Sequence, residues 1–89
     1  MSIVQEAEGI SPQEVIRVTK DLPKSARAVF LALVEKGPMK SKDLSKHTAL
    51  SSRTVRYGLE ILREHKLVRR IPDFNDLRSH FYKAKPNMS

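Results

Sequence analysis

The chain has 89 residues, no cysteine and a formal net charge of +7. This length corresponds to one small domain, and the absence of cysteine excludes disulfide bonds, thiolate metal sites and thiol catalysis. No apolar run reaches the length of a membrane span, and the first residues lack the basic and apolar regions of a secretory signal, so we expect a cytoplasmic protein that does not enter a membrane.

The N-terminal part of the chain predicts one helix. We expect a flexible N-terminus over residues 1–10, a single domain over 11–85 whose first helical element spans 11–22, and a tail over 86–89. Ser11 and Glu14 have the spacing of a capping box, so the helix should run over residues 12–21. Its apolar face, with Val15, Val18 and Leu22, can either pair with a second copy or fold back on its own domain.

A second helix should follow Pro23, since proline is tolerated in the first turn of a helix. Five apolar residues then recur at helical spacing: Ala26, Val29, Phe30, Leu33 and Val34. Gly37 and Pro38 end the pattern. We expect this segment to be the main core helix.

A helix-turn-helix follows. Ser41 can cap a short helix over residues 42–47 that has Leu44 as its apolar anchor, and residues 48–50 form a turn. A recognition helix is expected over 52–66, capped by Ser51 or Ser52. At 100° per residue its two faces separate: Arg53, Arg56, Tyr57 and Glu60 lie on one side, and Val55, Gly58, Leu59 and Leu62 on the other. The glycine should permit close packing of a neighbouring helix.

Two apolar-rich segments, 67–71 and 80–84, flank a polar loop and predict a β-hairpin. A recognition helix followed by such a hairpin is the order of a winged helix-turn-helix. The predicted fold is therefore mainly α with a small β-hairpin wing, an α+β winged helix-turn-helix, with the wing over residues 72–80.

The positive charge lies in the second half of the chain. Residues 1–39 carry five Lys/Arg and five Asp/Glu, whereas residues 40–89 carry twelve Lys/Arg and five Asp/Glu. Phosphate binding is a common reason for such asymmetry, although a merely solvated basic face remains an alternative. We therefore expect double-stranded DNA as the partner.

The expected DNA-binding residues lie mainly on the helix-turn-helix. The start of a recognition helix lies nearest the bases, so Ser51, Ser52, Arg53 and Thr54 should contact phosphates or base edges. Arg56 and Tyr57 follow one turn later. Lys42 and Lys46 should bind all sequences alike, and Lys83 should contact a backbone phosphate or remain solvated.

Several motifs together resemble archaeal members of the MarR-like winged-helix transcription regulators. The similar segments span residues 22–85: 22–27, 37–39, 53–62, 67–70 and the D-x-x-D-x-R motif at 73–78. The resemblance implies that Arg78 reaches the minor groove and that Asp76 helps to orient it. An arginine at a hairpin tip also suits the narrow minor groove of A/T-rich DNA. The alternative is an ordinary surface pair of Asp76 and Arg78.

The resemblance implies a dimer, because these regulators usually dimerise through long terminal helices. Only residues 85–89 follow the last expected strand, so we expect no C-terminal dimerisation helix and predict a homodimer through the N-terminal helix.

Other functions have weaker support. His47, His65 and His80 lie on separate elements without metal-ligand spacing, so we expect no metal. We also expect no cofactor, and the sequence does not determine whether a small molecule acts as effector. Without a glycine-rich phosphate loop, a Ser/His/Asp order or paired acidic residues, we expect no enzyme.

The main alternative is a winged-helix protein-interaction module of a transcription assembly, whose basic face binds an acidic partner. RNA binding is a third option, but the sequence shows no aromatic platform on which bases could stack. Salt-dependent affinity for duplex DNA discriminates between the first two.

Overall fold

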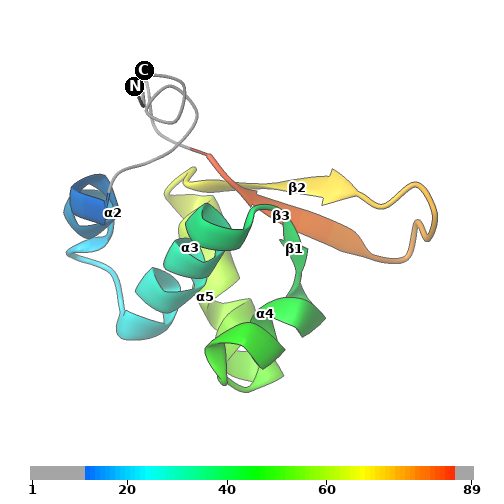
Figure 1. Ribbon diagram of the computed structural model, residues 1–89, viewed down its shortest axis with the longest axis horizontal. Helices are drawn as coiled ribbons and strands as arrows, with labels where there is room; N and C mark the ends of the chain where they lie inside the picture. The colour runs from blue at the N-terminus through cyan, green and yellow to red at the C-terminus, as the bar shows by residue number, and fades with distance from the viewer. Residues whose placement is uncertain (1–11, 86–89) are drawn as a thin grey trace.

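The computed structural model describes residues 12–85, as four helices and a three-stranded antiparallel sheet (Figure 1). In chain order the elements are α2 (Pro12–Thr19), α3 (Lys24–Lys36), β1 (Met39–Lys40), α4 (Ser41–Thr48), α5 (Ser52–Glu64), β2 (Val68–Pro72) and β3 (His80–Ala84). The loop joining β2 to β3 extends away from the helices (Figure 1). This arrangement confirms the predicted winged helix-turn-helix.

The core forms around α3. This helix buries Ala26, Val29, Phe30 and Leu33. Leu44 of α4 and the apolar face of α5 pack against the same cluster, which Leu67 and Val68 extend toward the sheet. Because apolar burial contributes roughly 25 cal/mol per Å², this cluster is the main source of stability for the helix-turn-helix.

The first helix folds back on its own domain. Val15 and Leu22 are buried, and Thr19 is fully buried with its hydroxyl donating to the carbonyl oxygen of Val15 at 2.5 Å. The helix ends at Thr19, two residues before the predicted end, because the N–H of Leu22 turns back to bond the carbonyl of Thr19 at 3.0 Å. The predicted cap, Ser11, lies outside the described residues.

The sheet has the strand order β1-β3-β2. The sequence predicted only the hairpin; β1 is an additional strand of two residues, in which Met39 pairs with Tyr82 and Lys40 with Phe81. A segment this short carries no alternating pattern that could be recognised. Its effect is to connect the end of α3 to the centre of the sheet.

The boundaries of α4 and α5 also differ from the predictions. Lys40 occupies the N-cap position of α4, so Ser41 is the first helical residue rather than the cap. The helix α5 ends at Glu64 instead of residue 66. There Lys66 adopts φ of 60°, and the N–H groups of Lys66 and Leu67 bond the carbonyls of Arg63 and Leu62. This pair of bonds is a Schellman motif, which turns the chain into β2.

Candidate nucleic-acid interface

The first turn of α5 is fixed by a side-chain cap. Ser51, not Ser52, is the N-cap: its Oγ accepts a hydrogen bond from the Thr54 N–H at 3.1 Å and donates to Thr54 Oγ1 at 2.9 Å. The cap satisfies one of the free N–H groups at the helix start. Other N–H groups of this turn lie at the positive end of the helix dipole, where an anion is stabilised.

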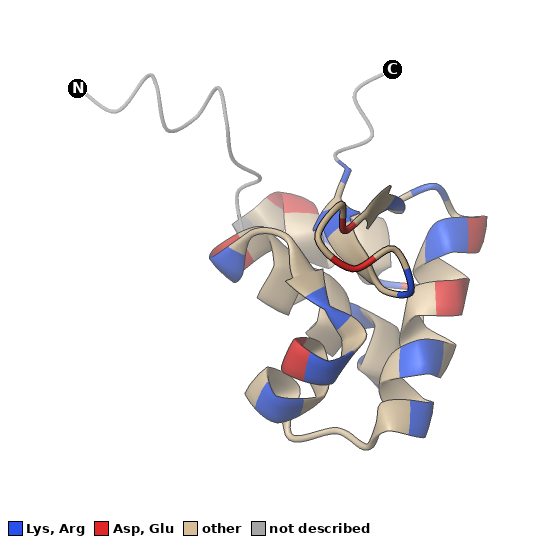
Figure 2. Ribbon diagram, turned by 90° about the vertical axis from the view of Figure 1, so that its right-hand side faces the viewer, with Lys and Arg blue, Asp and Glu red and all other residues tan. Residues whose placement is uncertain are grey.

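The two faces of α5 differ as the sequence predicted. Val55, Gly58, Leu59 and Leu62 are buried. Arg53, Arg56, Tyr57 and Glu60 are exposed on the outer side, where Figure 2 shows successive charged residues along the helix.

Gly58 allows α5 to lie close to α3. A Cβ atom at this position would be 3.1 Å from the Ser25 carbonyl oxygen and 3.3 Å from the Ala26 Cα. The glycine therefore determines how deeply α5 is seated and how its outer face is presented.

The preceding helix, α4, presents Lys42 and Lys46 on its exposed surface. Leu44 is its only residue fully buried. The turn to α5 is held by polar bonds: Ser45 Oγ donates to the Leu50 carbonyl at 2.5 Å, and the Leu50 N–H donates to Thr48 Oγ1 at 3.3 Å. These bonds fix the angle between the two helices of the motif.

An ion pair anchors the base of the wing. Lys40 Nζ lies 2.7 Å from Asp73 Oδ2, and the Asp73 side chain is only 10% exposed. This hydrogen bond to Lys40 lowers the pKa of the Asp73 carboxyl, with help from the Asn75 N–H, and it raises the pKa of Lys40. The Lys40 ammonium also lies 5.2 Å from the centre of the Phe81 ring. The sequence analysis did not identify this pair, since the two residues are 33 positions apart (73 − 40) and meet only because β1 joins the sheet.

At the tip of the wing, Asp76 and Arg78 are in direct contact. Asp76 Oδ1 accepts from both the backbone N–H and Nε of Arg78, each at 3.2 Å. The Arg78 side chain is 91% exposed. Its guanidinium is thus held at one atom and otherwise open to a ligand.

The structure does not bring Lys83 close to the recognition helix. Lys83 pairs with Arg69 across the hairpin. The next pair along the strands is Val68 with Ala84, and both of these residues contribute to the core. Because successive residues of a strand point to opposite faces, Lys83 lies on the sheet face directed away from the helices.

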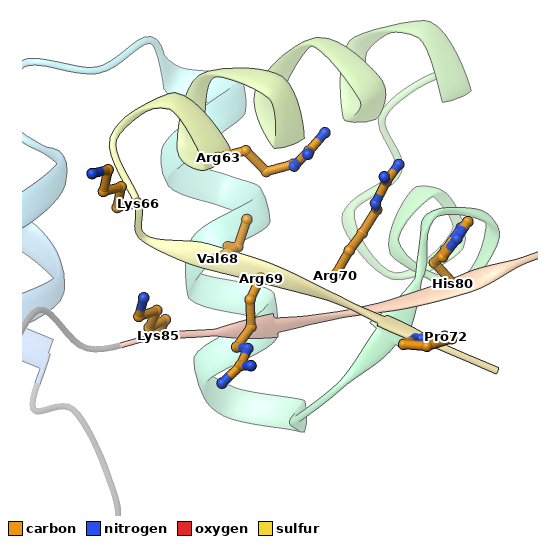
Figure 3. Close-up of a pocket in the computed structure, with 8 residues that line it drawn as sticks. All are labelled: Arg63, Lys66, Val68, Arg69, Arg70, Pro72, His80 and Lys85. Atoms are coloured by element: carbon orange, nitrogen blue, oxygen red, sulfur yellow. The ribbon is translucent and has the colours of Figure 1, made fainter. Parts of the chain in front are cut away.

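The sequence analysis missed a basic cleft between the end of α5 and the hairpin. This cleft has a volume of about 550 Å³ and its lining is mostly cationic: Arg63, Lys66, Arg69, Arg70 and Lys85, with Val68, Pro72 and His80. Figure 3 shows Arg63, Arg70 and His80 extending to the same side of the sheet, whereas Arg69 points to the opposite side. Arg63 was identifiable from the sequence, because it lies seven residues after Arg56 and hence on the same helical face. Arg70 required the strand register.

Within residues 12–85, His, Asp and Glu side chains nowhere form a group of three or more that could hold a metal ion. None of the described helices is both long and apolar enough to cross a membrane.

Comparison with known proteins locates the fold. No family model matches the sequence, and no curated protein matches it. Among solved structures, the MarR family transcription regulator SP03579 has a TM-score of 0.72 at 18% identity, over 83% of this chain and 48% of that one. This chain therefore spans about half the length of that regulator.

Two further structures agree. BpsR of Bordetella bronchiseptica, whose DNA binding is regulated by 6-hydroxynicotinic acid, has a TM-score of 0.65 at 24% identity, over 96% of this chain and 66% of that one. ST1889 protein from the thermoacidophilic archaeon Sulfolobus tokodaii has a TM-score of 0.66 at 26% identity, over 98% and 79%. The fold is that of the MarR-type winged helix, and it occurs here in bacterial and archaeal chains alike.

Proposed function

We propose that this chain is a MarR-like transcription regulator that binds double-stranded DNA sequence-specifically, with α5 in the major groove and the wing at the minor groove. The observation that carries the proposal is the division of α5. One face is buried against the core, and the opposite face presents Arg53, Arg56 and Tyr57 to solvent. BpsR, which has the same fold, is described as binding DNA.

Within this proposal, Arg53 and Arg56 read bases. Arginine can donate two parallel hydrogen bonds to O6 and N7 of guanine, and each such pair gives about 1–3 kcal/mol of discrimination. Tyr57 lies beside them on the exposed face. Ser51, Ser52 and Thr54, at the start of α5, are placed to contact phosphates or base edges there.

The remaining cations bind the DNA backbone. Lys42 and Lys46 flank the recognition helix on α4. The basic cleft, with Arg63 and Arg70, lies between α5 and the hairpin, where the phosphates between the major and minor grooves would pass. Lys83 faces away from the helices, so we assign it at most a phosphate contact.

We further propose that the protein binds as a homodimer. Two recognition helices one DNA turn apart would then read two half-sites. Val15 and Leu22 are already buried within their own domain, so pairing through α2 would use its outer side, where Ile16 is 64% exposed.

Salt titration of duplex binding tests the proposal, on sites selected from random sequences. If about five to eight phosphates are neutralised per dimer, log K should fall with log salt with a slope of about −0.9 per phosphate. A flat response, or salt-sensitive binding to an acidic protein without binding to duplex DNA, would instead support the protein-interaction module.

Substitutions then separate base reading from backbone contact. Arg53→Ala and Arg56→Ala should relax the sequence preference at particular positions and cost about 1–3 kcal/mol. Lys42→Ala and Lys46→Ala are the matched controls and should weaken binding to all sequences alike. Equal losses on every sequence from all four variants would contradict base reading by α5.

A further inference from the structure

The loop between β2 and β3 exposes apolar side chains that the folded domain does not use. Phe74 is 83% exposed and Leu77 is 68% exposed, which makes them the most exposed large hydrophobic residues in the described part of the chain. A single exposed apolar residue is ordinary on a protein surface. Here two of them occupy the tip of one loop, which extends away from the helices (Figure 1).

The loop presents these residues through two consecutive turns of the same design. In the first, the Asp73 carbonyl accepts the Asp76 N–H at 3.0 Å, and Asp73 Oδ1 accepts the Asn75 N–H at 3.0 Å. In the second, the Asp76 carbonyl accepts the Ser79 N–H at 3.0 Å, and Asp76 Oδ1 accepts the Arg78 N–H at 3.2 Å.

Each turn therefore begins with an aspartate whose side chain bonds the backbone two residues later, as in an Asx turn. Phe74 and Leu77 each follow such an aspartate directly, so they occupy equivalent positions three residues apart. The N–H of Asp73 also donates to the Ser79 carbonyl at 3.3 Å and closes the loop. The backbone of the tip is thus held by hydrogen bonds within the loop.

Ion pairs leave the tip close to neutral, since Asp73 pairs with Lys40 and Asp76 with Arg78. The attraction to a polyanion comes from the cations of the neighbouring cleft. Arg78 directly follows Leu77 and is 91% exposed, and the cleft at the base of the hairpin is lined mostly by cations. Within a duplex, apolar surface is offered by the faces of the stacked bases and by the sugars that line the minor groove. Proteins that reach it from the minor groove insert apolar wedges between base pairs and kink the duplex.

We propose that the wing tip is an apolar wedge, in which Phe74 enters a base step from the minor groove and Leu77 packs against the adjacent sugar. This inference rests on the proposed DNA binding and adds a deformation of the DNA to it. The wedge makes binding depend on how easily the contacted step unstacks. Pyrimidine–purine steps, which are flexible, should therefore be preferred beneath the wing.

The test uses the full chain and a duplex selected by the wild-type protein, with 2-aminopurine placed at each step of the flanks in turn. Unstacking at one step should raise the fluorescence there, and Phe74→Ala should abolish that rise. Affinity should fall about tenfold, since base–aromatic stacking contributes about 1–3 kcal/mol. Phe74→Leu keeps an apolar wedge but loses the ring, so it should retain the fluorescence rise and only part of the affinity.

Two controls make the result decisive. Because Phe74 is 83% exposed, Phe74→Ala should leave the melting temperature unchanged. The separate variant Arg56→Ala should reduce affinity on the selected site. If Arg56→Ala weakens binding while Phe74→Ala changes neither affinity nor fluorescence, DNA binding stands and the wedge is wrong.

Other outcomes are equally clear. A change of sedimentation mass in Phe74→Ala with unchanged DNA affinity would assign the tip to contact between protein molecules and overturn the wedge. Failure of the wild-type chain to bind any duplex would overturn the proposed function and the wedge together.

Discussion

The buried face of α5, here called the seat, and the wing lie on either side of one basic cleft. Different interactions hold the two regions in place. The seat is apolar: Val55, Leu59 and Leu62 are almost completely buried, and a Cβ at position 58 would lie only 3.1–3.3 Å from backbone atoms of α3. The wing loop places Phe74 and Leu77 in solvent. It is held by backbone hydrogen bonds and by the ion pair of Lys40 with Asp73.

This difference separates stability from positioning. Substitutions in the seat remove buried apolar contacts or create overpacking, which changes the free energy of unfolding by several kcal/mol. At the exposed tip of the wing, substitutions should change where Arg78 lies rather than whether the domain folds; only the buried Asp73 at its base should affect stability. Stability and DNA affinity, measured on the same variants, should therefore respond differently in the two regions.

The largest effect is expected at Gly58. Gly58→Ala places a Cβ about 3.1–3.3 Å from backbone atoms of α3, and overpacking of this kind costs about 1–3 kcal/mol. Alanine has the better helix propensity by about 0.8–1 kcal/mol, so a net loss of stability shows that packing outweighs propensity. Urea unfolding measures the change.

The matched control is Glu60→Ala, an exposed position two residues later on the same helix. This variant changes helix propensity without touching α3 and should alter stability by less than about 0.5 kcal/mol. Stabilisation by Gly58→Ala would show that α3 yields to the added methyl group and that the two helices are not in tight contact.

An intermediate effect is expected from the ion pair at the base of the wing. Because Lys40 lowers the pKa of Asp73, this carboxylate stabilises the fold above its unfolded-state pKa of about 3.9. The contribution is lost as pH falls through the lower folded-state value. Asp73→Asn should therefore be less stable than the wild type at neutral pH, and the difference should shrink as the solution becomes strongly acidic.

Thermal unfolding of both proteins from pH 7 down to pH 2 measures this difference. The amide signal of Asn75, which donates to the Asp73 carboxylate, should shift with pH much more in the wild type than in the variant. A difference in stability that is constant over the whole range would assign the effect of Asp73→Asn to something other than its charge.

The contrast between the two regions also explains how far the sequence predicts the structure. The seat follows from periodicity: the spacing of Val55, Leu59 and Leu62 places them on one helical face, and a helix needs no distant information to form that face. The cap at Ser51 is similarly local. These features were therefore predicted with the correct face, although the helix ended two residues early at its Schellman motif.

The wing depends on contacts between distant residues. The pairing of Lys40 with Asp73 requires β1, and the position of Arg70 in the cleft requires the register of β2 on β3. Neither can be read from the spacing of residues along one segment. The resemblance supplied Asp76 and Arg78 as a pair, but it gave no indication that Phe74 and Leu77 would be the exposed residues of the same loop.

The smallest effect on DNA affinity is expected at Asp76, where the direction of the change is the informative result. Asp76→Ala removes a negative charge, which by itself should strengthen binding to a polyanion. It also removes the acceptor that holds both N–H groups of Arg78. If orientation of Arg78 matters more, the variant should bind about two- to fivefold more weakly, as expected from the loss of one exposed pair. Glu64→Ala, which removes an exposed charge from the end of α5, is the control and should bind equally or more tightly.

Arg78→Ala completes this comparison. If Arg78 enters the minor groove, its loss should weaken binding most on duplexes with A/T-rich flanks, because their narrow groove attracts an inserted cation. Asp76→Ala should show the same dependence on the flanks in weaker form, since it acts only through Arg78. Fluorescence anisotropy on paired duplexes, identical at the centre and different in the flanks, measures both variants. Tighter binding by Asp76→Ala together with indifference of Arg78→Ala to the flanks would make the wing a general phosphate contact, and sequence reading would then belong to α5 alone.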